Sequence, residues 1–497
     1  MHVRSSVLPS SLSWKRLLPS WPLILGLFAF AKAIATPALL NDPDTYLHIA
    51  AGHWILVHLA LPFADSFSHS MPGAPWVPHE WLAETILAAG FNLGGWGAVE
   101  LLTAACFAIS IGIFTRLLLQ RFDPLPALVV SITTTWLLLP HLLARPHVLA
   151  LPLMVFWCGI LIESRDTERG PPLWVVPVMT LWANLHGGFM FGLAFAAFLG
   201  GEAVLLPAAG RTRAAEARRW AGFIALSMLA ALATPNGFAG LLQPFRLISM
   251  PTLPAAISEW RSASFEDFPA IEAWLLGTLF LEFAYGFRLP LTRLLLALGI
   301  FHLALQHVRH ADLLALVVPL AVAAPLGAQI RDRLRAMPTS NLSRHIERLA
   351  EPAALPAIAM ALALMVALGA LIVARPIDRS GDLATPSAAL TAARSLGASG
   401  PVFNTHRYGG YLIFEGMPVL IDGRLEMYGD AFLARYLQAS GGDETALSEM
   451  LDQYHIGWTI LLPHDGAVAV LDRLLGWRRA YADAQAVVHV RTGPPHR

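Results

Sequence analysis

The sequence has little charge and almost no cysteine. Only 14 % of its 497 residues are Asp, Glu, Lys or Arg, whereas 56 % are hydrophobic, a balance far too apolar for a soluble globular protein. The two cysteines, Cys106 and Cys158, both fall inside apolar runs, which excludes a disulfide framework and a zinc site built on cysteine. The net charge near zero gives no sign of a nucleic-acid partner. These features indicate a polytopic membrane protein.

About eleven apolar segments have a length that spans, or nearly spans, a bilayer. We expect each of them to form a helix. The first segment has a second interpretation, because "AKA" at 31–33 also fits a signal-peptidase site. In both cases the loop 41–80 lies on the outer side. The segments are 20–40, 96–119, 125–143, 146–163, 172–185, 187–207, 219–235, 270–287, 290–306, 309–329 and 353–375.

The basic residues are distributed unevenly between the two sides of these segments. Because Arg and Lys in short loops favour the cytoplasm, the richer side is predicted to be cytoplasmic, with the N-terminus inside. The odd number of crossings then places the C-terminal region outside. The predicted cytoplasmic residues are Arg4, Lys15, Arg16, Arg116, Arg121, Arg165, Arg169, Arg211, Arg213, Arg218, Arg219, Arg288, Arg293, Arg331, Arg333, Arg335, Arg344 and Arg348, whereas the outer loops hold only Arg145, Arg246, Arg261 and Arg309.

The remaining polar residues gather on the predicted outer side. Polar and ionisable groups at membrane depth are costly, so they usually mark a buried site or a pathway. We therefore expect one site at the outer leaflet. The stretches that carry these residues are "DPDTYLH" (42–48), "PHEW" (78–81), "ARPH" (144–147), "NLHGG" (184–188), "TPN" (234–236), "SEW" (258–260) and "HVRH" (307–310).

Two acids separated by one residue follow the first apolar segment. Asp42 before Pro43 fits a helix N-cap, since Pro suits the first helical position. Capping does not account for Asp44 and His48, which share one helix face at i, i+4 and can hold a metal or relay a proton. We therefore predict Asp44 as the catalytic base. Asp42 and Glu80 are further catalytic candidates, and Asp42, Asp44 and His48 are the candidate metal ligands.

The other candidates each have a structural alternative. "HEW" at 79–81 also suits an interfacial anchor, since Trp prefers the headgroup level. Arg145 and Arg309 are also suited to contact lipid phosphates, and Asn184 to His186 with two glycines fits either a helix break or a site loop. The predicted substrate-binding residues are His48, His79, Arg145, His147, Asn184, His186, Glu259, Arg309 and His310.

Two regions differ from the spanning segments. The first outer loop, 41–95, contains two amphipathic stretches, 46–61 and 80–95, that are predicted to lie in the interface as helices. From about 380 the chain alternates short β-type runs (401–415, 417–429, 458–463 and 486–491) with helical runs (429–440 and 444–456), which predicts a small α/β domain. Its "HRYGGY" and "IDGR" fit turns between strands or a surface that binds the acceptor and covers the membrane site.

The order of these features resembles the GT-C class of membrane glycosyltransferases. That class has an acidic Asp-x-Asp after the first span, two juxtamembrane helices and many later spans, and it includes protein O-mannosyltransferases, aminoarabinose transferases of lipid A and the oligosaccharyltransferase catalytic subunit. Over nearly the whole chain, "DPDTYLHIAAGHWIL", "PWVPHEWLAE", "WANLHGGF" and "FNTHRYGGYLIFEGMPVLIDGR" resemble a bacterial family of GT-C-like multi-pass proteins.

The resemblance implies a mainly α, GT-C-like bundle over 1–375 and a soluble α/β domain over 380–497 on the outer side of the bacterial cytoplasmic membrane. It implies an inverting glycosyltransferase that uses a polyprenyl-phosphate-linked sugar and a lipid, glycan or protein acceptor. Asp44 or Asp42 would be the catalytic acid of the first loop. A divalent metal (Mg or Mn) is expected only as an option, because Glu80 and Glu259 are the only later acidic candidates. A lipid or solute transporter or flippase, and a polymerase or ligase of surface polysaccharide, are the alternatives.

Overall fold

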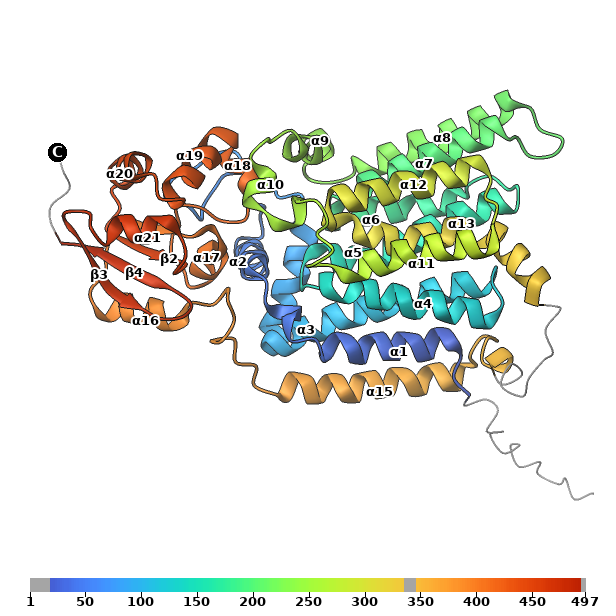
Figure 1. The fold of residues 1–497 in the computed structure, drawn as a ribbon, viewed down its shortest axis with the longest axis horizontal. Coiled ribbons are helices and arrows are strands. Elements are labelled where there is room, and N and C mark those ends of the chain that lie inside the picture. The colour runs from blue at the N-terminus through green and yellow to red at the C-terminus, as the bar shows by residue number, and fades with distance from the viewer. Residues whose placement is uncertain (1–17, 335–345, 493–497) are drawn as a thin grey trace, which may run out of the picture.

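The computed structural model describes residues 18–334 and 346–492. Its fold is mainly α, with a long helical bundle at one end and a small α/β domain at the other (Figure 1). The chain leaves the bundle after Ala374 and begins the first helix of the C-terminal domain at Ser387. Five of the basic residues used to predict orientation, Arg4, Lys15, Arg16, Arg335 and Arg344, lie outside the described residues.

All eleven predicted apolar segments form helices, and these run along the long axis of the bundle (Figure 1). Among the described residues, five helices are long and apolar enough to cross a membrane, and four more are apolar but shorter. The helices are α1 (Trp21–Ile34), α3 (Trp81–Leu119), α4 (Pro124–Leu138), α5 (Pro146–Asp166), α6 (Val176–Leu185), α7 (Phe189–Leu205), α8 (Arg213–Ala231), α11 (Pro269–Tyr285), α12 (Leu291–Gln306), α13 (Ala311–Leu334) and α15 (Leu355–Ala374).

Helix α3 combines the second predicted interfacial helix with the span that follows it. Its backbone departs from helical geometry at Gly94 and at Gly95, where φ is +58°. A positive φ is accessible to glycine without the steric cost that a side chain would bring. The two glycines therefore kink the chain at the boundary that the sequence predicts, so that residues 81–93 and 96–119 take different directions.

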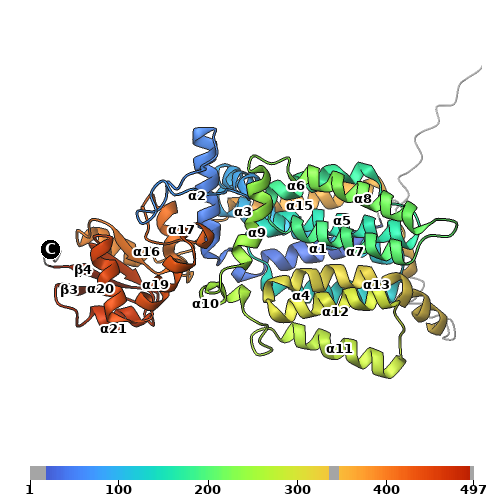
Figure 2. The same ribbon diagram turned by 90° about the horizontal axis from the view of Figure 1, so that it is seen from above.

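Helix α2 (Pro43–His58) lies across the end of the bundle, between the bundle and the C-terminal domain (Figure 2). Gly52 allows it to approach α3 closely, because a Cβ at this position would collide with the carbonyl oxygen of Glu84. That α2 lies in the membrane interface stays a prediction. Helix α2 presents its Asp42 end to both halves of the protein.

The long connection between α8 and α11 contains structure that the sequence did not predict. It forms α9 (Gly237–Ile248), α10 (Leu253–Ala256) and the 3-10 turn η5 (Ser258–Trp260). Because these elements are short and interrupted by proline, they lack the long periodic pattern from which helices are predicted. Four further 3-10 turns complete the bundle: η2 (Pro37–Leu40), η3 (Leu139–His141), η4 (Leu173–Val175) and η6 (Val308–His310).

The end of the bundle away from the C-terminal domain carries charged residues that pair with one another. Arg293 lies 3.0 Å from both Asp166 and Glu202, and Arg165 lies 3.2 Å from Glu202. These pairs join α5, α7 and α12. The loop between α7 and α8, which carries Arg211, lies at this end as well, opposite the C-terminal domain (Figure 1). The structure thus separates the predicted cytoplasmic loops from the predicted outer residues.

The C-terminal domain contains a four-stranded sheet in the order β1-β2-β4-β3. The strands are β1 (Val402–Asn404), β2 (Trp458–Leu461), β3 (Trp477–Ala482) and β4 (Val487–Arg491); β1 and β2 are parallel, and the other pairs are antiparallel. Side chains alternate between two apolar cores: Val402 faces one and Phe403 the other. Helices α16 (Ser387–Ser395) and α17 (His406–Phe414) cover the first face, and α18 (Leu425–Tyr428), α19 (Asp430–Ser440), α20 (Glu444–Gln453) and α21 (Gly466–Leu471) cover the second.

Part of the predicted strand pattern in this domain is wrong. The stretch 401–415 forms only the short strand β1 and then helix α17, and 417–429 ends in helix α18 instead of a strand. In α17, Gly409 lies against Asp422 and Gly410 against the carbonyl oxygen of Pro43 in α2, so neither position has space for a side chain. These tertiary contacts prevail over the β propensity of the aromatic and branched residues nearby. Helices α16 and α21 and strand β3 were not predicted.

Candidate active site

The first acid of the pair, Asp42, is the N-cap of α2. Its Oδ1 accepts a hydrogen bond from the backbone N–H of Asp44 at 3.1 Å, and Pro43 occupies the first helical position, as the sequence predicts. The side chain of Asp42 is fully buried, whereas that of Asp44 keeps 26 % of its surface exposed. Asp42 is therefore fixed against the backbone, and Asp44 is the acid that remains accessible.

The Arg145 guanidinium, at the N-cap of α5, joins three carboxylates at this point. Its Nη2 lies 2.7 Å from Asp42 Oδ1 and 3.0 Å from Asp44 Oδ2, while its Nε bonds the second oxygen of Asp42. Its Nη1 donates to Glu259 Oε1 at 2.7 Å. The sequence predicts Arg145 as a residue that binds substrate phosphate. In the structure all three of its nitrogens contact carboxylates of the protein, so its role with substrate stays a prediction.

The two acids differ in their protonation behaviour. Burial alone would raise the pKa of Asp42, but the charge and hydrogen bonds of Arg145 hold this pKa below its usual range. Burial and the neighbouring Asp42 charge raise the pKa of Asp44 despite Arg145. A raised pKa makes Asp44 the stronger proton acceptor of the two, which suits a general base.

His48, one turn after Asp44, faces Glu84 of α3. Its Nδ1 lies 3.3 Å from Glu84 Oε1. Burial would lower the pKa of His48, but the Glu84 hydrogen bond and nearby carboxylates raise it to about 8. His48 is therefore a cation at neutral pH. Its pairing with Glu84 removes it from the ligand set that the sequence predicts for a metal.

The raised pKa of His48 predicts a pH-dependent stability. The folded pKa of about 8 lies above the ordinary 6.5, so the stabilisation is complete below pH 6.5 and disappears as the pH rises through 8. The shift corresponds to about 2 kcal/mol, so we expect the melting temperature to fall between pH 6 and pH 9 by more in wild type than in His48→Gln. His53→Gln, an exposed change in the same helix, is the control. Equal pH dependence in wild type and His48→Gln would refute the assignment.

A second group of polar side chains lies at the start of α3 and in the turn after α6. Glu80 Oε1 lies 3.6 Å from His186 Nε2 and 3.9 Å from His79 Nε2. The rings of His186 and His147 lie 6.1 Å apart. Burial holds the pKa of His186 well below its ordinary value, so this imidazole is neutral and able to donate or accept a hydrogen bond.

Arg309, in turn η6, is the cation of the site that remains free of a carboxylate. Its guanidinium stacks on the Trp260 ring at 4.4 Å, and no carboxylate oxygen in the described part of the chain forms an ion pair with it within 4.0 Å. The charges of Glu259, Glu80 and Arg145 act on Arg309, which places it in the same constellation. His310, the next residue, lies with its ring 6.0 Å from His307.

Asn184, a predicted substrate-binding residue, makes hydrogen bonds within the protein. Its Nδ2 donates to the carbonyl oxygens of Thr180 and Ala233 at 2.8 and 3.1 Å, and its Oδ1 accepts from Trp81 Nε1 at 2.8 Å. The side chain thus joins α3, α6 and the end of α8. Because its amide groups are occupied by these bonds, we interpret Asn184 as the residue that positions the neighbouring His186 turn.

The C-terminal domain reaches the acid pair. Gly423 lies directly against Asp44 Oδ1, and a Cβ there would collide with the carboxylate. The charge of Asp44 acts on His406 at the start of α17, and that of His79 acts on Glu426. None of Gly423, His406 and Glu426 is among the residues that the sequence predicts for the site. His406 and Gly423 lie in "HRYGGY" and "IDGR", which were considered as a surface over the site, whereas Glu426 lies outside both stretches.

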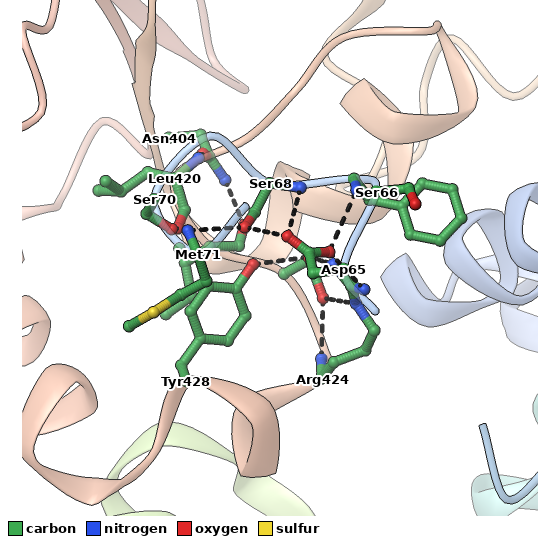
Figure 3. A network of polar contacts seen from close by, with 12 residues as sticks. Asp65, Ser66, Ser68, Ser70, Met71, Asn404, Leu420, Arg424 and Tyr428 are labelled. Atoms are coloured by element: carbon green, nitrogen blue, oxygen red, sulfur yellow. Dashed lines mark hydrogen bonds and ion pairs between the residues drawn. The ribbon is translucent and has the colours of Figure 1, made fainter. Parts of the chain in front are cut away.

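A buried ion network fixes this domain to the first loop (Figure 3). Arg424 lies 2.7 Å from Asp65 and 2.6 Å from Asp422, and Tyr428 donates to Asp422 at 2.7 Å. The two carboxylates are completely buried, and the guanidinium also lies 4.8 Å from the Trp76 ring. We call these four residues, Asp65, Asp422, Arg424 and Tyr428, the interdomain network.

Backbone pairing accompanies this network. His69 N–H donates to the carbonyl of Val419 at 2.9 Å, and Val419 N–H donates to the carbonyl of Phe67 at 3.1 Å. Asn404 holds the other side of the same segment, because its side chain bonds the backbone of Leu420 and Ile421. The first loop therefore forms an isolated parallel β-bridge with the C-terminal domain, between Ser68 and Val419.

Two solved structures have the same overall fold as this chain. The archaeal oligosaccharyltransferase AglB from Archaeoglobus fulgidus, in complex with an inhibitory peptide and a dolichol-phosphate, matches with a TM-score of 0.51 at 12 % identity, over 89 % of this chain and 69 % of that one. The oligosaccharyltransferase of the same organism, tethered to an acceptor peptide, matches with a TM-score of 0.50 at 11 % identity, over 90 % and 69 %. The chain thus has the fold of the GT-C membrane glycosyltransferases.

ArnT from Cupriavidus metallidurans, bound to undecaprenyl phosphate, matches with a TM-score of 0.49 at 13 % identity, over 94 % of this chain and 97 % of that one. No model of a protein family matches the sequence, and no curated protein matches it. At these identities the similarity concerns the fold, so the function must be argued from the residues of this chain.

Proposed function

We propose that this protein transfers a sugar from a polyprenyl-phosphate-linked donor to an acceptor at the outer leaflet of the bacterial cytoplasmic membrane. The observation that carries the proposal is the combination of an accessible acid, Asp44, with Arg309, a cation that has no carboxylate partner among the described residues, at one end of an apolar bundle. Sugar transfer needs both: a base for the acceptor and a positive charge for the departing phosphate. The AglB structure of the same fold contains a dolichol-phosphate, which supports a lipid-phosphate donor.

In the proposed reaction, Asp44 accepts the proton of an acceptor hydroxyl. The hydroxyl oxygen forms a bond to the anomeric carbon of the sugar, and the bond from this carbon to the phosphate oxygen breaks with its electron pair on the oxygen. The product is a glycoside with inverted configuration, and the leaving group is the polyprenyl phosphate. Arg309 stabilises the leaving phosphate, and the neutral His186 donates a hydrogen bond to the donor.

The location of the polar groups favours transfer over transport. A transporter needs its polar residues near the middle of the membrane, between repeats of the fold. Here helix α2, whose first turn carries Asp44, lies between the end of the bundle and the C-terminal domain (Figure 2). Arg145 contacts both Asp44 and Glu259, and the charge of Glu259 acts on Arg309. We propose that this end and the domain face the periplasm and that the N-terminus is cytoplasmic. The acceptor is a lipid, a glycan or a protein, and a glycan acceptor would make the enzyme a surface-polysaccharide polymerase or ligase.

Arg309→Ala tests the proposal through the donor phosphate. Charge-assisted hydrogen bonds contribute about 1.5–3 kcal/mol, so we expect binding of polyprenyl phosphate to purified protein in nanodiscs to weaken by about tenfold to a hundredfold. Arg261→Ala is the matched control, because this exposed arginine of the same region bonds only the carbonyls of Pro254 and Ala255. Undiminished binding by Arg309→Ala, or an equal loss in both variants, would contradict the proposed role.

A further inference from the structure

Three carboxylates from distant parts of the chain meet at one point. Asp42 and Asp44 belong to the first loop, and Glu259 to turn η5 more than halfway along the sequence. Carboxylate oxygens gathered in this way are the ligands that Mg²⁺ and Mn²⁺ prefer. The three acids alone would therefore predict a divalent metal ion bound between them.

The position between these carboxylates is occupied by the guanidinium of Arg145. It contacts Asp42 and Asp44 through Nη2, at 2.7 and 3.0 Å, and Glu259 through Nη1 at 2.7 Å. A divalent cation bound to the same oxygens would lie within a few ångströms of a group that never loses its positive charge. Both oxygens of Asp42 are already engaged, because they accept hydrogen bonds from Arg145 and from the N–H of Asp44.

The third predicted ligand is engaged elsewhere. Nδ1 of His48 lies 3.3 Å from Glu84 Oε1 of α3, so this nitrogen is engaged with a carboxylate other than the two acids. In the described part of the chain no group of three or more His, Cys, Asp or Glu side chains has a geometry that could hold a metal ion. The donor set Asp42, Asp44 and His48 therefore does not fit a metal.

We infer that the Arg145 guanidinium takes the place of a divalent metal in this site: it gathers the three carboxylates, fixes the orientation of Asp44 and supplies the positive charge. Arg145 is thus a positioning residue that acts through Asp44. The catalytic part of this inference rests on the proposed function, but the arrangement of the cation does not. The inference predicts that a site for a metal appears when the guanidinium is removed.

The test measures Mn²⁺ binding by electron paramagnetic resonance in wild type, Arg145→Ala and Arg165→Ala. Wild type should bind no Mn²⁺ at this position, and its transfer activity should be unchanged in EDTA. Arg145→Ala should lose transfer by about a hundredfold or more, bind a single Mn²⁺ in competition with Mg²⁺ and regain part of its activity when Mn²⁺ is added. Arg165→Ala is the control at the opposite end of the bundle. It removes one of the two arginines that pair with Glu202 and leaves Arg293 in place, so this variant should not bind Mn²⁺.

Two results would overturn the inference: stoichiometric Mn²⁺ in wild type that is lost in Asp44→Asn, or transfer by wild type that EDTA abolishes and Mn²⁺ restores. Absence of Mn²⁺ from folded Arg145→Ala would also overturn it. If Arg145→Ala fails to fold, Arg145→Gln replaces it, and the Mn²⁺ titration of wild type decides in any case. If wild type transfers sugar from none of the donors, the proposed function is wrong. The Mn²⁺ binding measured by electron paramagnetic resonance still tests whether Arg145 takes the place of a metal.

Discussion

Asp44→Asn should reduce sugar transfer by about a hundredfold or more while leaving the protein folded. The amide keeps the size and the hydrogen-bonding capacity of the carboxylate but cannot accept the acceptor proton. The side chain is partly exposed and only one of three carboxylates on Arg145, so its loss leaves that guanidinium paired with Asp42 and Glu259. The measurement is transfer from a panel of polyprenyl-phosphate sugars by purified protein in lipid, alongside the melting temperature.

Two further variants complete this test. Asp123→Asn, which affects a half-exposed carboxylate at the opposite end of the bundle, should retain full activity. Asp42→Asn should lower the melting temperature, because it removes the negative charge that pairs with the buried Arg145 while keeping the helix cap. Full activity in Asp44→Asn together with inactivity in a folded Asp42→Asn would assign the base to Asp42. Full activity in both would remove the acid pair from the mechanism.

Arg424→Ala should destabilise the protein by about 3–5 kcal/mol, the cost of leaving a buried charge without its partner. The substitution leaves two completely buried carboxylates, Asp65 and Asp422, without their cation. We expect a large fall in the melting temperature and faster proteolysis of the linker 375–386, since the interdomain network holds the C-terminal domain against the first loop.

Arg435→Ala is the matched control for this change. It removes an arginine of the same domain, but one that is exposed and pairs with the exposed Glu449, so its effect should be about 1 kcal/mol or less. A melting temperature of Arg424→Ala equal to that of Arg435→Ala would show that the interdomain network contributes no stability. A loss of transfer in Arg424→Ala at a temperature where it is folded would link the network to the position of Asp44.

The parts of the structure that could be predicted from the sequence are those with a local pattern. Long apolar runs defined the bundle helices, and the cap of Asp42 followed from the Asp-Pro pair at the start of α2. Helix α17 was predicted as a strand because its reason for being helical lies in contacts of Gly409 and Gly410 with distant segments. No local pattern reports such contacts.

The candidate site shows the same division. Residue type and the predicted position on the outer side of the membrane were enough to select four site residues that lie at one end of the bundle: Asp44, Glu80, His186 and Arg309. These two criteria could not distinguish Arg145 from Arg309. Arg145 pairs with the acids, whereas Arg309 has no carboxylate partner among the described residues, and this difference depends on the three-dimensional arrangement. Gly423 lacks a reactive group, so only its packing against Asp44 reveals it.

The pairing of the first loop with the C-terminal domain determines the order in which contacts can form during synthesis. Ser70 and Leu420, which bond each other, are 350 residues apart, so the ribosome completes one long before the other. Throughout that interval Asp65 lacks its ion-pair partner Arg424. The backbone of residues 67–69 likewise lacks its hydrogen-bond partner Val419. A chain that has been synthesised only as far as the helical bundle therefore lacks the partners that hold residues 65–69 of the first loop. The loop and the candidate site beside it reach their final arrangement only after residues 419–424 have been added.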